Sequence, residues 1–178
     1  RQQINYHLAK NKVVLDAQLE DTLILNLKGK VIFSNNEENT GKDKSKKEYF
    51  KQISRYFKDD NVLKKLRRNP IFVVYASDVY ISDDFKVPAL AVSNIITARA
   101  TGLPLGVLVN RYRLDALIKS IETKEGVAGK TGKIYLINKD GLLLNFPKFF
   151  SGKKEEIILK EKIDIPVVIT VLEDSVQM

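Results

Sequence analysis

The chain has 178 residues, of which 44% are hydrophobic and 29% charged, so we expect a packed globular core rather than a disordered chain. It contains no cysteine, which excludes a disulfide scaffold and any thiolate metal site. The formal net charge is +8, and lysine-rich polar segments supply most of it. We interpret these segments as solvated surface. An anionic partner such as nucleic acid or lipid headgroups is the alternative, although no aromatic side chains are interleaved with the basic ones.

The first predicted element is an amphipathic helix over residues 2–20. Apolar residues recur there at helical spacing, with polar residues between them. They are Ile4, Leu8, Leu15 and Leu19. No stretch of the chain approaches the roughly 20 apolar residues needed to cross a bilayer, so we expect any membrane anchor to lie outside this segment.

A β-hairpin is predicted over residues 22–35, because two apolar runs flank a turn that contains Gly29. A polar loop follows over 35–45. Ser45 and Glu48 have the spacing of a capping box, which predicts that a second helix begins there. The apolar face of this helix would consist of Tyr49, Phe50, Ile53, Tyr56 and Phe57.

The middle of the chain predicts strands. Residues 71–76 form a β-branched and aromatic run typical of a buried strand, and 79–82 continue it after a bend. Strands over 89–98 and 105–110 flank the turn at 101–104 and form a long antiparallel pair. Apolar residues then recur at helical spacing and predict a helix. They are Leu114, Leu117, Ile118 and Ile121.

The C-terminal part repeats the first hairpin. Placing Gly141 over Gly29 also places Asn138 over Asn26, and this predicts a second hairpin of the same type over 133–146. A polar loop over 151–154 and two strands, near 156–159 and 166–172, complete the chain. Hairpin-linked strands with helices gathered between them indicate an α+β fold rather than a doubly wound sheet.

This order of elements, with several phrases in it, resembles the double Cache (PAS-like, or PDC) sensor domains. These domains are the extracytoplasmic input regions of membrane-bound histidine kinases, chemoreceptors and diguanylate cyclases. The similarity spans nearly the whole chain. The phrases that carry it are Gly29–Asn35, Thr40–Asp43 with Lys47–Phe50, Tyr80–Ser82, Gly102–Val109 and Gly129–Gly141.

The resemblance implies a long N-terminal helix over 1–21, a membrane-distal PAS-like lobe over 22–121, and an abbreviated membrane-proximal lobe over 122–178. Both lobes would contain antiparallel sheets. It further implies an extracytoplasmic location in a receptor of the cell membrane, most often a sensor histidine kinase of a two-component system. The receptor would be a homodimer, with transmembrane helices flanking this fragment, and it would signal through the N-terminal helix.

By the same resemblance, a small molecule such as an organic acid or amino acid would bind in the distal lobe. Lys47 or Arg99 would take a carboxylate, and Asp78 an amine. Core packing, turn formation or solvation are the alternative roles for each of these side chains. The full predicted set is Lys47, Tyr49, Phe50, Tyr75, Ser77, Asp78, Tyr80, Ser93 and Arg99.

The amino-acid-sensing pattern of this family includes a tryptophan, which this chain lacks, so an amino-acid ligand is less favoured. We expect no catalytic residue, cofactor or metal site in the fragment, because it has one histidine and no cysteine. Two alternatives stay open: a cytosolic PAS-like or GAF-like regulatory module, and a basic domain that binds nucleic acid or another anionic surface. We do not expect a nucleic-acid partner.

Overall fold

The computed structural model describes residues 18–59, 61–64, 73–124, 134–146, 151 and 153–163. The chain divides into two compact units. The first unit comprises Arg1–Ser77 and Leu90–Tyr112, and the second comprises Asp78–Ala89 and Arg113–Met178. The segment over 78–89 therefore groups with the C-terminal residues, whereas we expected it within the lobe over 22–121. The lobe boundaries at 21/22 and 121/122 stay a prediction.

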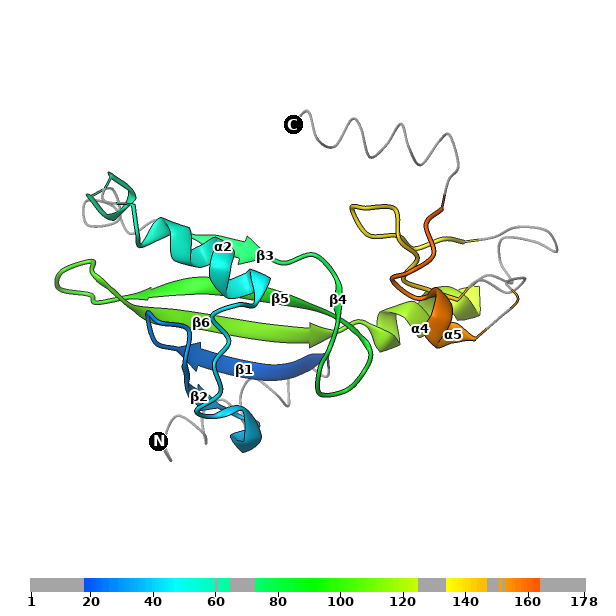
Figure 1. The fold of residues 1–178 in the computed structure, drawn as a ribbon, viewed down its shortest axis with the longest axis horizontal. Coiled ribbons are helices and arrows are strands. Elements are labelled where there is room, and N and C mark those ends of the chain that lie inside the picture. The colour runs from blue at the N-terminus through cyan, green and yellow to red at the C-terminus, as the bar shows by residue number, and fades with distance from the viewer. Residues whose placement is uncertain are drawn as a thin grey trace. The chain divides into compact units, whose positions relative to one another are not determined.

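A six-stranded sheet forms the main element of the fold (Figure 1). Its order is β2-β1-β6-β5-β3, with β4 also paired to β5. The pairings β1–β2, β1–β6, β3–β5 and β4–β5 are antiparallel. The predicted α+β class with antiparallel sheet is thus confirmed. The strands are β1 (Leu19–Leu25), β2 (Val31–Ser34), β3 (Val74–Ala76), β4 (Tyr80–Ile81), β5 (Pro88–Thr97) and β6 (Pro104–Arg113).

One face of this sheet carries the core of the first unit. Leu23 lies opposite Val109 and Leu25 opposite Val107, and all four side chains are fully buried. Side chains two residues apart along a strand point to the same face of the sheet, so this register places the four side chains together. Removing such a side chain from the core costs about 2–5 kcal/mol of stability, because a cavity is left behind.

Helix α2 (Glu48–Tyr56) packs its apolar side on the sheet. Tyr49, Phe50 and Ile53 are buried, as their helical spacing predicts, whereas Tyr56 is exposed. The predicted capping box does not form, since the N-cap is Lys47 and it makes no side-chain cap. Ser45 instead donates its backbone N–H to Asp43 Oδ1 at 2.8 Å, in a loop that is bonded to the β1–β2 turn. The helix therefore starts only after this loop.

Both predicted hairpin turns are present. Gly29 lies between β1 and β2 with φ +86°, and Gly141 lies in the corresponding turn of residues 134–146 with φ +78°. Only glycine adopts this left-handed conformation without a steric cost, which explains why a glycine marks each turn. The long β5–β6 hairpin is likewise confirmed, and its turn contains Gly102 at φ +66°.

The second unit contains two helices, α4 (Asp115–Lys124) and α5 (Lys154–Ile157). Helix α4 was predicted from the spacing of its apolar residues. The unit has its own small core, made by Leu143, Ile157 and Ile163, with Tyr135, Ile137 and Phe146 packed against it.

Three sequence predictions need correction. The first strand already begins at Leu19, so the predicted N-terminal helix cannot extend to Glu20. Strand β3 is not buried, because it lies at an end of the sheet order and Val74 is exposed. The predicted strand over 156–159 overlaps the helical turn α5, in which Ile157 alone faces the core. Most of the predicted N-terminal helix falls on residues 1–17, which lie outside the described residues. The predicted strand over 166–172 also lies outside them.

Candidate functional site

Three of the predicted ligand residues come together where α2 packs on β3 and β5. Ser93 on β5 is fully buried, and its hydroxyl donates to the Tyr49 carbonyl at 2.9 Å and reaches the Tyr75 carbonyl at 3.3 Å. The Tyr75 hydroxyl donates to Glu48 Oε1 at 2.8 Å, at the exposed first turn of α2. Ser93 therefore joins the helix to the two strands, while the Tyr75 ring spans from the sheet to the surface.

The remaining first-unit residues of the predicted set are spread around this point. Phe50 is buried and its ring lies 6.2 Å from that of Phe57, so it belongs to the core. Lys47 is half-buried at the N-terminus of α2. Ser77 accepts a hydrogen bond from the Ala91 amide at 2.9 Å. Arg99 is exposed at the β5–β6 turn.

Asp78 and Tyr80 belong to the second unit. Asp78 accepts hydrogen bonds from the Val79 amide and, at 3.3 Å, from the Asn138 side chain, and Lys139 Nζ lies 3.7 Å away. Its carboxylate thus links the 134–146 hairpin to the start of the 78–89 segment. Tyr80 pairs with Ala89 across β4 and β5. Whether the nine predicted residues bind a ligand stays a prediction.

A buried ionic cluster in the first unit was missed from the sequence. Arg111 Nη2 lies 3.1 Å from Asp21 Oδ2 and 3.2 Å from Glu20 Oε1, and all three side chains are almost completely buried. Glu20 and Asp21 are adjacent in sequence, and a strand would normally point them to opposite faces. The register of β1 against β6 shifts between Leu19 and Asp21, and this bulge lets both carboxylates reach one guanidinium.

The Asp21 carboxylate is surrounded by further donors. Its oxygens accept from the Ser34 hydroxyl at 2.9 Å and from Asn39 Nδ2 at 2.9 Å. The cluster therefore joins β1, β2, β6 and the 3₁₀ turn η2 (Glu37–Asn39). Because its donors and acceptors are directed at one another, we assign it a structural role. A basic residue on β6 and two acids on β1 are visible in the sequence, but their pairing follows only from the register.

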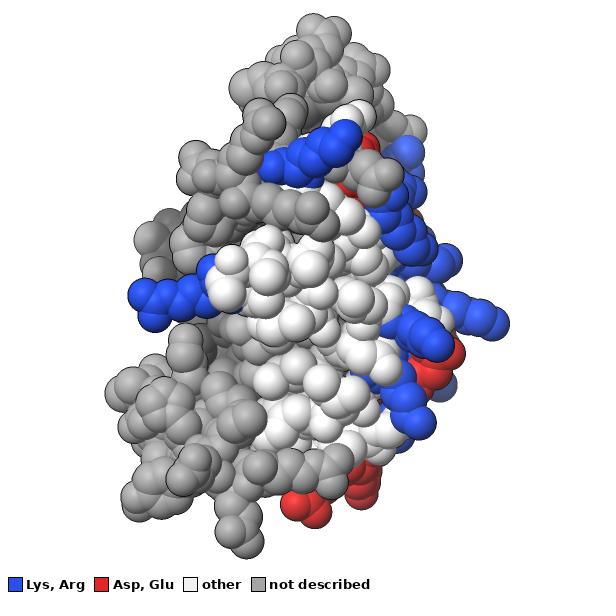
Figure 2. All heavy atoms as spheres, turned by 90° about the vertical axis from the view of Figure 1, so that its left-hand side faces the viewer, with Lys and Arg blue, Asp and Glu red and all other residues white. Residues whose placement is uncertain are grey.

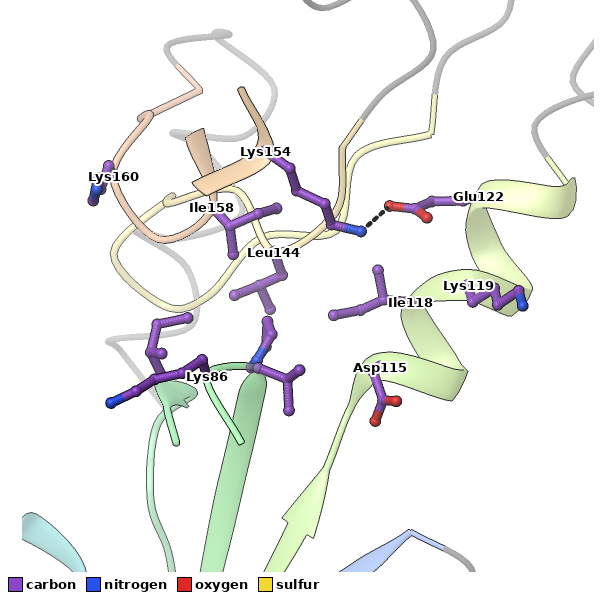
Figure 3. Close-up of a pocket in the computed structure, with 12 residues that line it drawn as sticks. Lys86, Asp115, Ile118, Lys119, Glu122, Leu144, Lys154, Ile158 and Lys160 are labelled. Carbon is purple, nitrogen blue, oxygen red and sulfur yellow. Dashed lines mark hydrogen bonds and ion pairs between the residues drawn. The ribbon is translucent and has the colours of Figure 1, made fainter. Parts of the chain in front are cut away.

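A cavity of about 750 Å³ lies within the second unit. This volume is within the range of small-molecule sites, which are roughly 300–1,000 Å³. None of the nine predicted residues lines it. Its apolar wall includes Ile118, Leu144 and Ile158, whose side chains point toward one another in Figure 3. The other lining residues are Ile81, Lys86, Val87, Pro88, Asp115, Lys119, Glu122, Lys154 and Lys160.

Both acids that line the cavity are engaged by cations. Asp115 forms a bidentate pair with Arg113, at 3.0 and 2.5 Å, and this hydrogen bonding holds the pKa of the Asp115 carboxyl below its ordinary value of 3.8. Glu122 Oε1 accepts from the Phe146 amide at 3.0 Å and from Lys154 Nζ at 3.3 Å (Figure 3). Four lysines against two acids leave the lining with an excess of positive charge.

Other features bear on the class of protein. Within the described ranges there is no group of acidic or histidine side chains arranged to hold a metal ion, and no helix has the length and hydrophobicity to cross a membrane. Figure 2 shows one face, on which most basic side chains lie along one side with acidic ones among them, and others lie at the opposite edge and near the top. The centre of the described surface in that view is uncharged, so the positive charge of this face is not gathered in one block.

Comparison with known proteins identifies the fold. No protein-family model and no curated protein matches the sequence. Solved structures do match: the sensor domain of the histidine kinase DctB from V. cholerae aligns with 99% of this chain at 14% identity and a TM-score of 0.57. The extracellular domain of rpHK1S-Z16 aligns with 86% of this chain at 22% identity and a TM-score of 0.57. The chain has the fold of these domains, which is Cache-like (PDC-like).

A further match to this Cache-like fold is the ligand-binding domain of the amino-acid chemoreceptor PctB from Pseudomonas aeruginosa PAO1, solved with L-Gln. It aligns with 90% of this chain at 14% identity and a TM-score of 0.53. The chain spans 57% of the DctB and rpHK1S-Z16 structures and 55% of the PctB structure. The predicted resemblance to Cache domains is thereby confirmed at the level of the fold. DctB and PctB contribute a sensor domain and a ligand-binding domain to this comparison.

Proposed function

We propose that this chain is the extracytoplasmic ligand-sensing domain of a transmembrane signalling receptor, of the sensor histidine kinase type. The observation that carries the proposal is the fold, in which α2 packs on one face of the sheet. The sensor domain of a histidine kinase aligns with 99% of this chain. A fold alone does not fix a function, so the proposal depends on the ligand that the site can accept. A chemoreceptor would use the same input domain with a different cytoplasmic output.

The proposed ligand is a small organic acid, amino acid or related metabolite that binds in the first unit beside α2, β3 and β5. Tyr75 supports this location because its hydroxyl lies at the exposed edge of the contact between α2 and β3, where it is bonded to Glu48. Lys47 is the N-cap residue of the same helix and adjoins Glu48, which accepts the Tyr75 hydroxyl. Apolar walls with a few convergent polar groups are what a small polar ligand requires.

Signalling would work by population shift rather than by chemistry. Ser93 joins α2 to β3 and β5 through two backbone carbonyls, so a ligand that moves α2 must also move this bond. We propose that ligand binding favours one of two packings of the N-terminal helix, within a homodimer whose membrane spans lie outside this chain. A ligand shifts such an equilibrium only by its difference in affinity for the two states.

A thermal-shift screen of the chain against organic acids, amino acids, amines and a short nucleic acid tests the proposal. A ligand at one hundred times its Kd adds roughly 2.7 kcal/mol to stability, which raises the Tm by several degrees. We expect a small-molecule hit whose shift is reduced in Tyr75→Phe and Lys47→Gln. Tyr56→Phe and Arg55→Gln, both exposed on α2, are the matched controls. Stabilisation by nucleic acid alone would contradict the proposal.

A further inference from the structure

The cavity of the second unit has the properties of a ligand site in its own right. We propose that it binds a small organic carboxylate with an apolar body, independently of the ligand site proposed for the first unit. The cavity belongs wholly to the second unit, since its lining residues come from 78–89 and 113–160.

The apolar side of the cavity would receive the body of the ligand. Ile118, Leu144 and Ile158 are nearly completely buried, and their side chains also line the cavity (Figure 3). They come from α4, from the 134–146 hairpin and from the segment that follows α5. Apolar side chains from three separate segments therefore border one space that an aliphatic chain can fill.

The charges around the cavity favour an anionic ligand over a cationic one. Glu122 already accepts from Lys154 and from the Phe146 amide, and Asp115 is held by Arg113, so an incoming amine would have to displace an existing partner. Lys86, by contrast, makes no ion pair within the part of the chain that the structure describes, and its side chain is exposed at the rim. Lys86 and Lys154 lie on different sides of the cavity in Figure 3, so an incoming carboxylate would pair with one lysine or the other, and neither pairing requires an acid to lose its cation.

The backbone around the cavity is strained where the ligand would bind. Among the described residues, the non-glycine residues with positive φ are Lys86 at 57° and Leu159 at 58°. Lys86 lines the cavity, and Leu159 lies between the lining residues Ile158 and Lys160. Such conformations cost roughly 1–3 kcal/mol each and gather at ligand sites, where the surrounding structure holds them. The turn at Lys86 is fixed by Ser82, which accepts the Lys86 amide at 3.0 Å through its carbonyl.

Amide chemical-shift mapping of the whole chain with hexanoate tests this proposal. We expect saturable shifts in the residues that line the cavity, while a ligand of the first unit would shift Tyr75 and Ser93 instead. Hexanoate is expected to bind more tightly than acetate by roughly fourfold for each methylene buried. Hexanamide has the same body without the charge, so it is expected to bind much more weakly.

The variant Lys86→Gln/Lys154→Gln is expected to weaken hexanoate binding by about fivefold, since one partly exposed charge pair is lost whichever lysine the carboxylate uses. Lys28→Gln, which removes an exposed lysine of the β1–β2 turn, is expected to leave it unchanged. Melting curves of the variants confirm that all of them are folded. Absence of saturable shifts at the cavity, equal binding of hexanamide, or unchanged binding in the double variant would each overturn the proposal. None of these results would affect ligand binding in the first unit.

Discussion

Asn26 and Asn138 make the same hydrogen bonds in two separate turns. The side-chain oxygen of Asn26 accepts from the amides of Lys28 and Lys30, at 2.9 and 3.0 Å. That of Asn138 accepts from the amides of Asp140 and Leu142, at 3.0 and 2.8 Å. In each turn the glycine that follows donates its amide to the asparagine carbonyl at 3.0 Å. The repeated sequence phrase therefore encodes one turn structure, used once in each unit.

This relationship predicts that the acceptor oxygen, not the amide nitrogen, stabilises the first turn. Asn26→Ala is expected to lower the free energy of unfolding by about 1 kcal/mol, because two backbone amides lose their partner but remain open to water. Asn26→Asp keeps an acceptor and is expected to lose less. Urea denaturation of both variants measures the difference, and equal losses would contradict this account.

Gly29 and Gly41 form a natural pair for testing steric crowding. Both have φ +86°, but a Cβ on Gly29 would lie 2.6 Å from the Ser45 Cα, whereas a Cβ on Gly41 would meet nothing within 4 Å. Gly41→Ala is expected to cost about 1–2 kcal/mol, the usual cost of a left-handed residue. Gly29→Ala is expected to cost clearly more, because the loop that carries Ser45 must also move. Similar Tm values for the two variants would argue against this packing.

The buried cluster predicts a large effect from a single carboxylate. Asp21→Ala is expected to destabilise the chain by about 3–5 kcal/mol, because Arg111 and Asn39 would remain buried with a missing acceptor. Asp115→Ala removes a carboxylate from the half-exposed pair with Arg113 and is expected to cost no more than about 1 kcal/mol. Denaturant unfolding of the two variants, compared at one pH, measures this ordering. Equal losses in the free energy of unfolding would show that water reaches the Asp21 cluster, contrary to its burial.

The Asp115 carboxyl predicts a defined pH dependence. Its pKa is lowered from 3.8, chiefly by the hydrogen bond from Arg113, so the folded state binds this proton less readily than the unfolded chain does. The pair therefore contributes its stability above the unfolded pKa, and this is lost as the pH falls through the folded pKa. Carbon-detected NMR titration is expected to give a midpoint below 3.8, and Arg113→Gln is expected to raise it. An unchanged midpoint in the variant would contradict the assignment of the cause.

Much of the fold follows from local sequence patterns. The two hairpin turns, the β5–β6 pair and the buried face of α2 were predictable because each depends on residues close together in the chain. The start of α2 was not, because Ser45 is held by the distant turn at Gly29 and by Asp43 rather than by the helix. The sequence of α5 predicts a strand instead of a helix, because a short apolar run fits either structure.

The candidate sites were less predictable than the fold. Tyr49, Tyr75 and Ser93 lie together because α2, β3 and β5 are neighbours, and their role in ligand binding stays a prediction. The cavity of the second unit could not be predicted, because residues from four separate segments form it and Ile118 and Leu144 look like ordinary core positions. The contact between Arg111 and both Glu20 and Asp21 depends on a bulge that the sequence does not mark.

The measurement that tests the central claim most directly is an amide chemical-shift map of the chain against a mixture of organic acids and amino acids. The proposed sensory role predicts saturable shifts that centre on Tyr49, Tyr75 and Ser93 and that weaken in Tyr75→Phe. The same titration with a short nucleic acid is expected to give only weak shifts that vanish with added salt. Saturable shifts with nucleic acid, and none with any small molecule of the mixture, would contradict the sensory role.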